Sequence, residues 1–102
     1  MDAVDAVKRY LKGQNLEQIG RVDEAVDLYE TAVADGFDSS GPYDRLIALY
    51  ADRARHSDVV RVAEAALASV RTHRQKQEWY ERMRAEARRA AADVPVAAPK
   101  RS

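Results

Sequence analysis

The chain has 102 residues, the size of one small domain, with 46% hydrophobic residues, 33% charged residues and a formal net charge of zero. It contains no cysteine, which excludes disulfides, thiol catalysis and cysteine-based metal sites. No apolar run approaches the roughly 18 residues of a membrane span, and the charged start MDAVDAVKRY has no apolar signal segment, so we expect a cytoplasmic protein.

Apolar residues recur at three- and four-residue steps along most of the chain, which predicts helices rather than strands. The first helix carries Val4, Val7 and Leu11 at this spacing. The second is N-capped by Asp23. It ends at Gly36, because glycine accepts the left-handed conformation that closes many helices.

Three further helices follow. Pro42 belongs to the first turn of the third, where a proline has no hydrogen bond to lose. Ser57 or Asp58 caps the fourth, and Thr72 with Gln75 has the capping-box spacing that opens a fifth. No glycine or proline separates these last two helices, so an alternative stays open in which they form one rod and favour a swapped dimer.

A shift of 34 residues superposes the apolar positions of the two halves: Leu16 falls on Tyr50, Ala32 on Ala66. A fixed 34-residue period of helix–turn–helix units is the tetratricopeptide signature. The stretch GQNLEQIGRVDEAVDLYETAVADGF closely resembles that family's consensus, with the expected residue types at Gly13, Leu16, Gly20, Ala25, Tyr29 and Ala32. The second copy is weaker. It matches the consensus at Tyr43, Leu46, Tyr50 and Ala66. It departs from the consensus at three positions: Ala54 replaces the turn glycine, Val59 replaces the first small residue, and Ala63 replaces the aromatic residue.

The resemblance implies an all-α domain over residues 1–92, in a right-handed array. Two hairpins occupy about 6–39 and 40–73, and a capping helix occupies about 73–92. The capping helix ends the array because the positions that would face a following helix are polar: Gln77, Glu81 and Arg84. Residues 93–102 are rich in proline and alanine, and we expect them to be disordered.

Arrays of this family bind extended peptides in a concave groove lined by the first helix of each hairpin. Carried over to this chain, the groove residues are Tyr10, Gln14, Gln18, Asp44, Arg45, Ala48, Asp52, Gln75, Glu78, Trp79 and Arg82. The family's carboxylate clamp for acidic C-terminal tails would keep only Arg45 as a cation, so that ligand is not expected. The resemblance therefore implies an adaptor or scaffold that binds a protein or peptide.

Trp79, the single tryptophan, has three interpretations: an anchor in the groove, a core side chain beside Ala48 and Ala51, or a contact between two copies. The two parts of the chain carry opposite charge. Residues 1–70 have 8 basic and 13 acidic side chains, whereas residues 71–102 have 9 and 4. We expect a homodimer through the fifth helix or the concave face.

The basic fifth helix supports an alternative function, that of a nucleic-acid-associated accessory protein. The glutamates spaced three or four residues from its arginines favour a solvated helix with internal ion pairs instead, and we expect no nucleic-acid partner.

No pattern in the sequence points to catalysis, a cofactor or a metal. There is no phosphate-binding loop and no metal-ligand cluster. His56 and His73 are far apart in the sequence and are best interpreted as solvated side chains. We therefore expect a protein that is not an enzyme.

Overall fold

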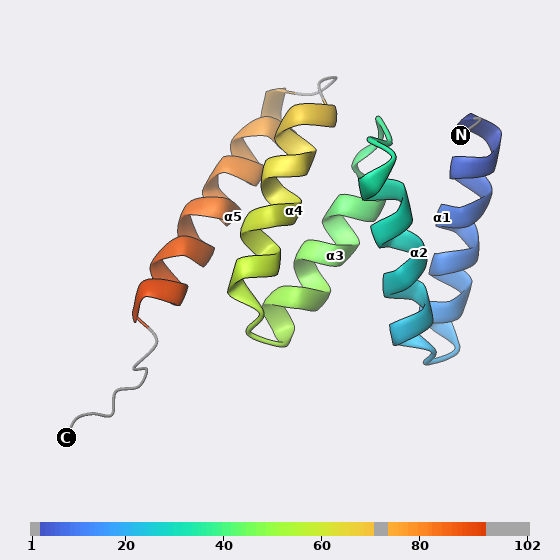
Figure 1. The fold of residues 1–102 in the computed structure, drawn as a ribbon, viewed down its shortest axis with the longest axis horizontal. Coiled ribbons are helices and arrows are strands. Elements are labelled where there is room, and N and C mark those ends of the chain that lie inside the picture. The colour runs from blue at the N-terminus through green and yellow to red at the C-terminus, as the bar shows by residue number, and fades with distance from the viewer. Residues whose placement is uncertain (1–2, 71–73, 94–102) are drawn as a thin grey trace.

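The computed structural model describes residues 3–70 and 74–93, and over these residues the chain is all-helical, with no strand. It has five helices: α1 (Ala3–Gln18), α2 (Val22–Ala34), α3 (Ser40–Asp52), α4 (His56–Ser69) and α5 (Arg74–Asp93) (Figure 1). The predicted all-α class is confirmed. Within the described ranges no helix is both long and apolar enough to cross a bilayer.

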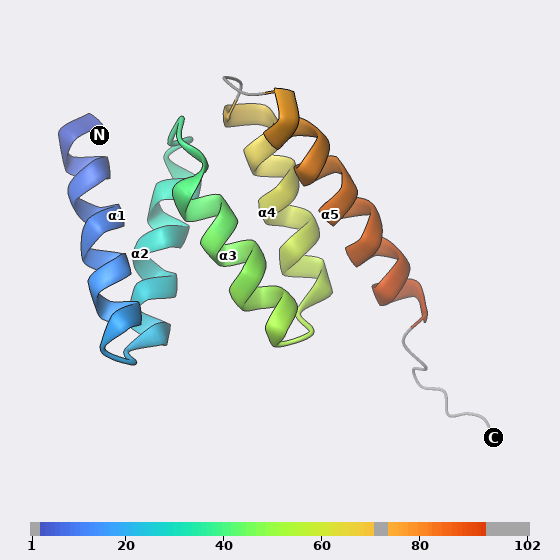
Figure 2. The ribbon, with the colours of Figure 1, turned by 180° about the vertical axis from the view of Figure 1, so that it is seen from behind.

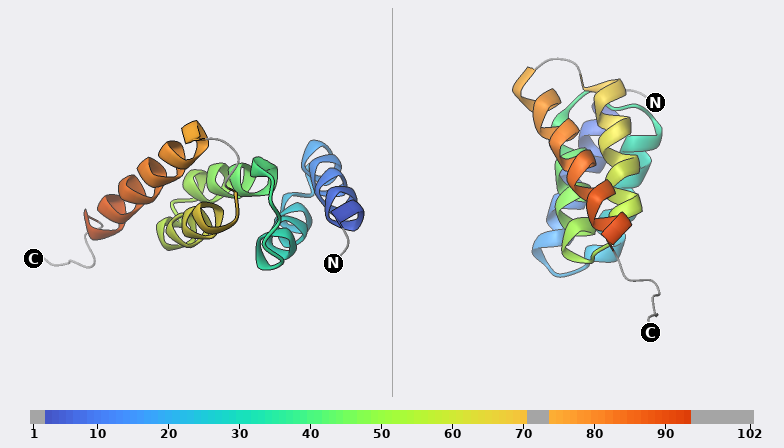
Figure 3. Two further views of the ribbon diagram at one scale, coloured as in Figure 1. Left: turned by 90° about the horizontal axis from the view of Figure 1, so that it is seen from above. Right: turned by 90° about the vertical axis from the view of Figure 1, so that its left-hand side faces the viewer.

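The helices stand side by side in a single row, and consecutive helices run in opposite directions (Figures 1 and 2). Seen from above, α1, α3 and α5 lie on one side of the row and α2 and α4 on the other (Figure 3). The molecule is therefore elongated and flat, with extents of 53 × 32 × 19 Å. The inner helices are packed from both sides, whereas α1 and α5 form the ends.

The fourth and fifth helices are separate, so the alternative of one continuous rod is wrong. α4 ends at Ser69, α5 begins at Arg74, and the two pack against each other along their lengths. Their connection lies outside the described residues, as does the predicted cap Thr72. The fifth helix runs to Asp93, one residue into the segment expected to be disordered, and residues 94–102 lie outside the description.

Two helices begin earlier than the caps expected from the sequence. Arg21 and Arg55 hold the N-cap positions of α2 and α4, and neither forms a side-chain cap bond. The expected caps Asp23, Ser57 and Asp58 lie within the first turns instead. Both carboxylates remain favourable there, because the amino end of a helix carries partial positive charge.

The turn inside each half of the chain has the same hydrogen bonds, 34 residues apart. In the first turn, Gly20 N–H donates to Glu17 O (3.0 Å) and Arg21 N–H to Leu16 O (2.8 Å). In the second, Ala54 N–H donates to Ala51 O (3.0 Å) and Arg55 N–H to Tyr50 O (2.9 Å), so every donor and acceptor lies 34 residues after its counterpart in the first turn. Gly20 and Ala54 both adopt left-handed backbone, with φ of 84° and 56°. Both turns are therefore Schellman motifs.

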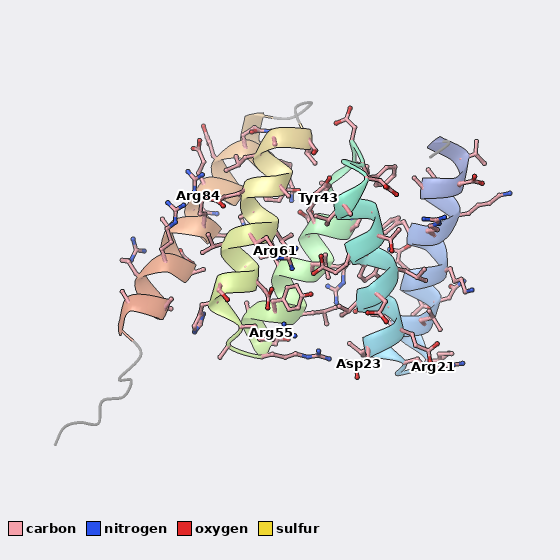
Figure 4. The ribbon with its side chains drawn as sticks, viewed as in Figure 1. Arg21, Asp23, Tyr43, Arg55, Arg61 and Arg84 are labelled. Carbon is pink, nitrogen blue, oxygen red and sulfur yellow. The ribbon has the colours of Figure 1, made fainter. Side chains whose placement is uncertain are left out.

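Gly36 ends α2 as expected, with φ of 69°. Its N–H donates to Val33 O, and the N–H of Phe37 donates to Ala32 O, which makes a third Schellman motif. The hydroxyl of Tyr43 on α3 donates 2.7 Å to the carbonyl of Phe37 and fixes α3 against this turn (Figure 4). Pro42 lies in the first turn of α3, as predicted.

The core lies along the middle of the row. Its largest fully buried side chains are Tyr29, Tyr43, Tyr80, Leu46, Ile47, Val59, Val62 and Val70. α2 approaches α1 closely because Gly13 has no side chain: a Cβ there would lie 2.6 Å from Cε1 of Tyr29. The stripe Tyr80, Met83, Ala87 and Ala90 faces inward on α5, where Tyr80 and Ala87 are buried.

The first helix presents a different face from the one its apolar spacing suggests. Val4, Val7 and Leu11 are exposed, and α1 turns Ala6, Gly13 and part of Tyr10 towards the rest of the molecule. The sequence pattern identifies the helix correctly, but the apolar residues that carry the pattern do not mark its buried face.

Candidate functional site

The residues predicted to line a groove come from α1, α3 and α5, and these three helices share one side of the row (Figure 3). The structure thus brings the predicted helices together on one surface, which we call the odd-helix face. Several of the predicted side chains, however, are engaged in contacts between helices.

Tyr10 packs between α1, α2 and α3. Its ring centroid lies 5.9 Å from that of Tyr29, and its hydroxyl accepts a hydrogen bond of 2.9 Å from Gln14 Nε2. The ring also lies against Gly41, where a Cβ would come within 2.6 Å of the tyrosine oxygen. Tyr10 is therefore half-buried at the start of α3, and Gln14 is oriented along α1 by its bond to Tyr10.

Arg45 is bound within the protein. Its Nε and Nη2 donate to the two oxygens of Glu17 on α1, at 3.0 and 2.5 Å. The hydroxyl of Tyr29 on α2 donates to the same carboxylate at 2.8 Å. The hydrogen bonds from Arg45, and then that from Tyr29, hold the pKa of Glu17 below that of an ordinary glutamate against the opposing effect of burial. A bidentate pair of this kind leaves Arg45 poorly placed to grip a ligand carboxylate.

Asp44 forms a second joint, between α3 and α5. Its carboxylate accepts 2.7 Å from Lys76 Nζ and 2.8 Å from the hydroxyl of Tyr80. Burial and then the bond to Asp44 raise the pKa of Tyr80. The Lys76 ammonium also lies 4.4 Å from the ring centroid of Trp79, a cation–π contact.

Trp79 agrees in part with its interpretation as a core side chain, whereas its roles as a groove anchor or as a contact between copies stay predictions. It is half-buried, packs against the core, and lies edge-on to Tyr80 with ring centroids 5.4 Å apart. The rest of the indole remains accessible on α5. Trp79 is therefore a residue at the edge of the core that also forms part of the odd-helix face.

The remaining predicted residues are accessible. Gln18, Asp52, Gln75, Glu78 and Arg82 are exposed, and Ala48 is half-buried. The open part of the odd-helix face is thus polar, of mixed charge, and bordered by one aromatic ring.

Sequence reasoning missed a third joint of the same kind, between α2, α3 and α4. Glu30 accepts hydrogen bonds from Tyr50 and from both terminal nitrogens of Arg61, the latter at 2.9 and 2.6 Å (Figure 4). Burial opposes ionisation of Glu30, but Arg61 and Tyr50 outweigh it and lower its pKa. Burial and the bond to Glu30 raise the pKa of Tyr50 to about 12.

We call these three groups the carboxylate joints: each unites an acid, a tyrosine hydroxyl and a cation. The cation follows the acid by 28 residues for Glu17, 31 for Glu30 and 32 for Asp44. An acid followed by a cation at about this spacing is a weak sequence signal, because Asp52 and Arg82 have the same spacing and form no such joint. Glu17, Glu30 and Lys76 are the residues that this signal adds.

The cavities lie away from the predicted groove residues. One, of about 170 Å³, is formed by Ala51 of α3, His56 and Val59 of α4, and Met83, Glu86, Ala87 and Ala90 of α5. Another lies between α1 and α2, beside Lys12, Leu16 and Leu28. Glu24 and Asp27 also line the second cavity. The described residues include no group of three or more potential metal ligands.

Two cations of the basic helix α5 pair with carboxylates of other helices, not with the glutamates of α5. Lys76 pairs with Asp44, and Arg88 pairs with Glu64 of α4 at 2.6 Å between exposed side chains. Arg82 and Arg89 are exposed, and Arg84 is half-buried (Figure 4). No protein-family model, curated protein or solved structure matches this chain.

Proposed function

We propose that the protein is a tetratricopeptide-like interaction module that binds a protein or peptide segment through its odd-helix face. The observation that carries the proposal is the repeated turn, with equal hydrogen bonds and left-handed backbone at Gly20 and Ala54. Two units of the family's length, stacked in a row with their first helices on one side, form the scaffold on which such arrays present a binding surface. The cytoplasmic location expected from the sequence belongs to this proposal.

The contacts of the odd-helix face define the class of partner. Arg45 and Lys76 are already bound to carboxylates of the protein, so neither cation is free to bind the carboxylates of an acidic C-terminal tail. The accessible groups are the amides of Gln18 and Gln75, the carboxylates of Asp52 and Glu78, and the guanidinium of Arg82, beside the open part of Trp79. This set suits an extended segment of mixed polarity that offers backbone groups to the amides and an apolar side chain to the indole.

A photo-crosslinking amino acid placed at single positions tests the proposal in the native host. At Asp52 and Arg82, exposed on the odd-helix face, we expect one recurrent protein adduct. At Glu64, exposed on α4 on the opposite side, we expect none. Equal adducts from both sides would contradict binding at the odd-helix face.

A separate measurement on the purified protein tests the alternative function, nucleic-acid binding. Sequence-independent binding through Arg82 and Arg89 would appear as a gel shift that weakens steeply with salt. We expect no shift at physiological salt. A shift abolished by Arg82→Glu and Arg89→Glu would replace the interaction module with an accessory nucleic-acid protein.

A further inference from the structure

The exposed large hydrophobic side chains of the described residues gather at one end of the molecule. They are Val4, Val7, Leu11 and Ile19, with 57%, 44%, 50% and 67% of their surface exposed. The first three follow each other at three and four residues and form one line along α1, which we call the α1 stripe. Ile19 lies past the end of α1.

The α1 stripe can be compared with the equivalent positions on α3, which lie 34 residues later and are covered by another helix. Gly41 and Arg45 of α3 stand 34 residues after Val7 and Leu11. α1 itself covers both, because Tyr10 lies against Gly41 and an ion pair joins α1 to Arg45. The equivalent face of α1 is exposed, and it carries apolar side chains where α3 has a glycine and an arginine.

Another complete hairpin does not suit this end. Pro42 and Leu46 of α3 are buried within the row. In α1 the positions 34 residues earlier are Lys8 and Lys12, both exposed. A preceding hairpin would bury these ammonium groups, whereas one helix laid along the stripe leaves them in water at its edge.

The other end of the row offers no matching surface. Among the described residues, α5 exposes no large hydrophobic side chain. Head-to-tail stacking would therefore lay the α1 stripe on a charged helix. Two α1 ends facing each other bury apolar surface on both sides and form a closed twofold pair.

We propose that the α1 stripe binds the α1 stripe of a second copy of this chain, with the two helices antiparallel and the twofold axis close to Val7. Val4 of one copy then lies beside Leu11 of the other. The exposed Asp5 of one copy then lies between Lys8 and Lys12 of the other copy. Its negative charge offsets the repulsion between the two Lys8 ammonium groups, which approach each other near the axis. The site is independent of the proposed peptide binding.

The pair is weak because the contact is small. A helix of 16 residues is about 24 Å long and buries less than the roughly 800 Å² per partner of a standard interface. We expect a concentration-dependent dimer with a Kd of about 10–100 μM.

Sedimentation equilibrium of the full chain over a concentration series measures this constant. Leu11→Glu should weaken dimerisation by at least about tenfold, since it buries a carboxylate in the paired stripe. Ile19→Glu introduces the same charge at the most exposed hydrophobic residue, beyond the paired segment, and should leave the dimer unchanged. Ala85→Glu, on the exposed side of α5, should also leave it unchanged.

Asp5→Lys tests the charge arrangement without touching the stripe. It leaves only lysines along this edge, so the dimer should weaken and the effect should shrink as salt is added. Circular dichroism of each variant separates loss of pairing from loss of fold.

Single cysteines give the orientation, because the chain has none of its own. In the antiparallel pair, Val7→Cys should form a disulfide-linked dimer under mild oxidation, and a mixture of Val4→Cys with Leu11→Cys should form the crossed dimer. Efficient self-linking of Leu11→Cys, with none of the crossed product, would overturn the antiparallel arrangement.

A monomer at about 500 μM would overturn the proposal outright, as would a dimer that survives Leu11→Glu but is lost in Ala85→Glu. Neither result affects the crosslinks expected at Asp52 and Arg82. Failure of those crosslinks, conversely, leaves the sedimentation of the α1 variants unchanged.

Discussion

Arg45 has a different role in the structure from the one predicted from the sequence. By position it lines a groove, and it would be the single cation of a clamp. In the folded chain its guanidinium joins α1 to α3 through Glu17, and Tyr29 completes the joint from α2. The side chain of Glu17 is 17% exposed, so the joint is sheltered enough for its hydrogen bonds to matter more than those of a surface pair.

Substitutions at Tyr29 separate packing from hydrogen bonding. Tyr29→Phe removes only the hydroxyl bonded to Glu17 and should lower the free energy of unfolding by about 1–2 kcal/mol. Tyr29→Ala also leaves a cavity against Gly13 and should cost about 3–5 kcal/mol. Urea denaturation measures both. Equal losses in the two variants would mean that the ring contributes nothing to packing.

Acid should weaken the joint at Glu17. The folded state holds the pKa of this glutamate below its unperturbed 4.5, chiefly through Arg45, so the folded chain binds fewer protons than the unfolded chain. The stabilisation is therefore complete above about pH 4.5 and is lost as the pH falls through the folded value.

Glu17→Gln removes this pH-dependent contribution. The variant should be less stable than the wild type at neutral pH, and the two stability curves should converge as the pH falls through the lowered pKa of Glu17 in the folded state. Glu24→Gln, at an exposed pair with Arg21, is the matched control and should follow the wild type. Parallel curves for Glu17→Gln and the wild type would rule out the joint as a source of stability.

At this scale the sequence predicts the packing residues better than the polar ones. Gly13, Ala25 and Tyr29 are recognisable because each position admits a narrow range of side-chain sizes. The partner of Arg45 lies 28 residues away on another helix, and only the stacking of the helices determines which carboxylate it meets.

Among the elements, the second turn has the more strained backbone. Ala54 adopts φ of 56°, a conformation that costs a residue with a Cβ roughly 1–2 kcal/mol, whereas Gly20 adopts the same conformation freely. The hydrogen bonds of the turn and the packing of α3 against α4 hold Ala54 in place.

Ala54→Gly should therefore stabilise the protein, by about 0.5–1 kcal/mol after the extra entropy of an unfolded glycine is counted. Gly20→Ala should destabilise it by a similar amount, because a Cβ there meets no neighbouring atom and only the backbone conformation is affected. Thermal melts of the two variants should move in opposite directions. A lower melting temperature for Ala54→Gly would contradict the left-handed assignment.

The helices themselves follow from apolar spacing, glycine and proline, but the orientation of α1 does not. Its buried positions are Ala6 and Gly13, which contribute little hydrophobicity, while Val7 and Leu11 dominate the pattern from the exposed side. A periodicity argument assumes that the most apolar face is the buried one. That assumption fails where close approach of two backbones requires small residues.

For the whole molecule, the row is best packed in its middle. α3 and α4 contribute most of the fully buried side chains, whereas α1 contributes Ala6 and is packed against the row from one side. Arrays of this kind lose structure from their ends, because each end unit has one neighbour.

Hydrogen exchange should show this gradient. Amides of α3 and α4 should exchange most slowly, and those of α1 should exchange first, as measured by mass spectrometry of peptic fragments at low protein concentration. Leu11→Glu serves as a monomeric reference, since pairing at α1 would slow its exchange in the wild type. Uniform protection from α1 to α4 would indicate one cooperative unit instead of a row that opens from its end.

The carboxylate joints also show that residues in contact are separated by short stretches of the sequence. Each joint connects helices that are at most two places apart, and the longest sequence separation within a joint is the 36 residues between Asp44 and Tyr80. Closing short loops costs little chain entropy, so such topologies fold in microseconds to milliseconds. The first hairpin holds all the side chains it needs to pack Tyr29 against Gly13, and α3 adds Arg45 only afterwards. The chain can therefore acquire its structure progressively from the amino terminus while the later helices are still being synthesised.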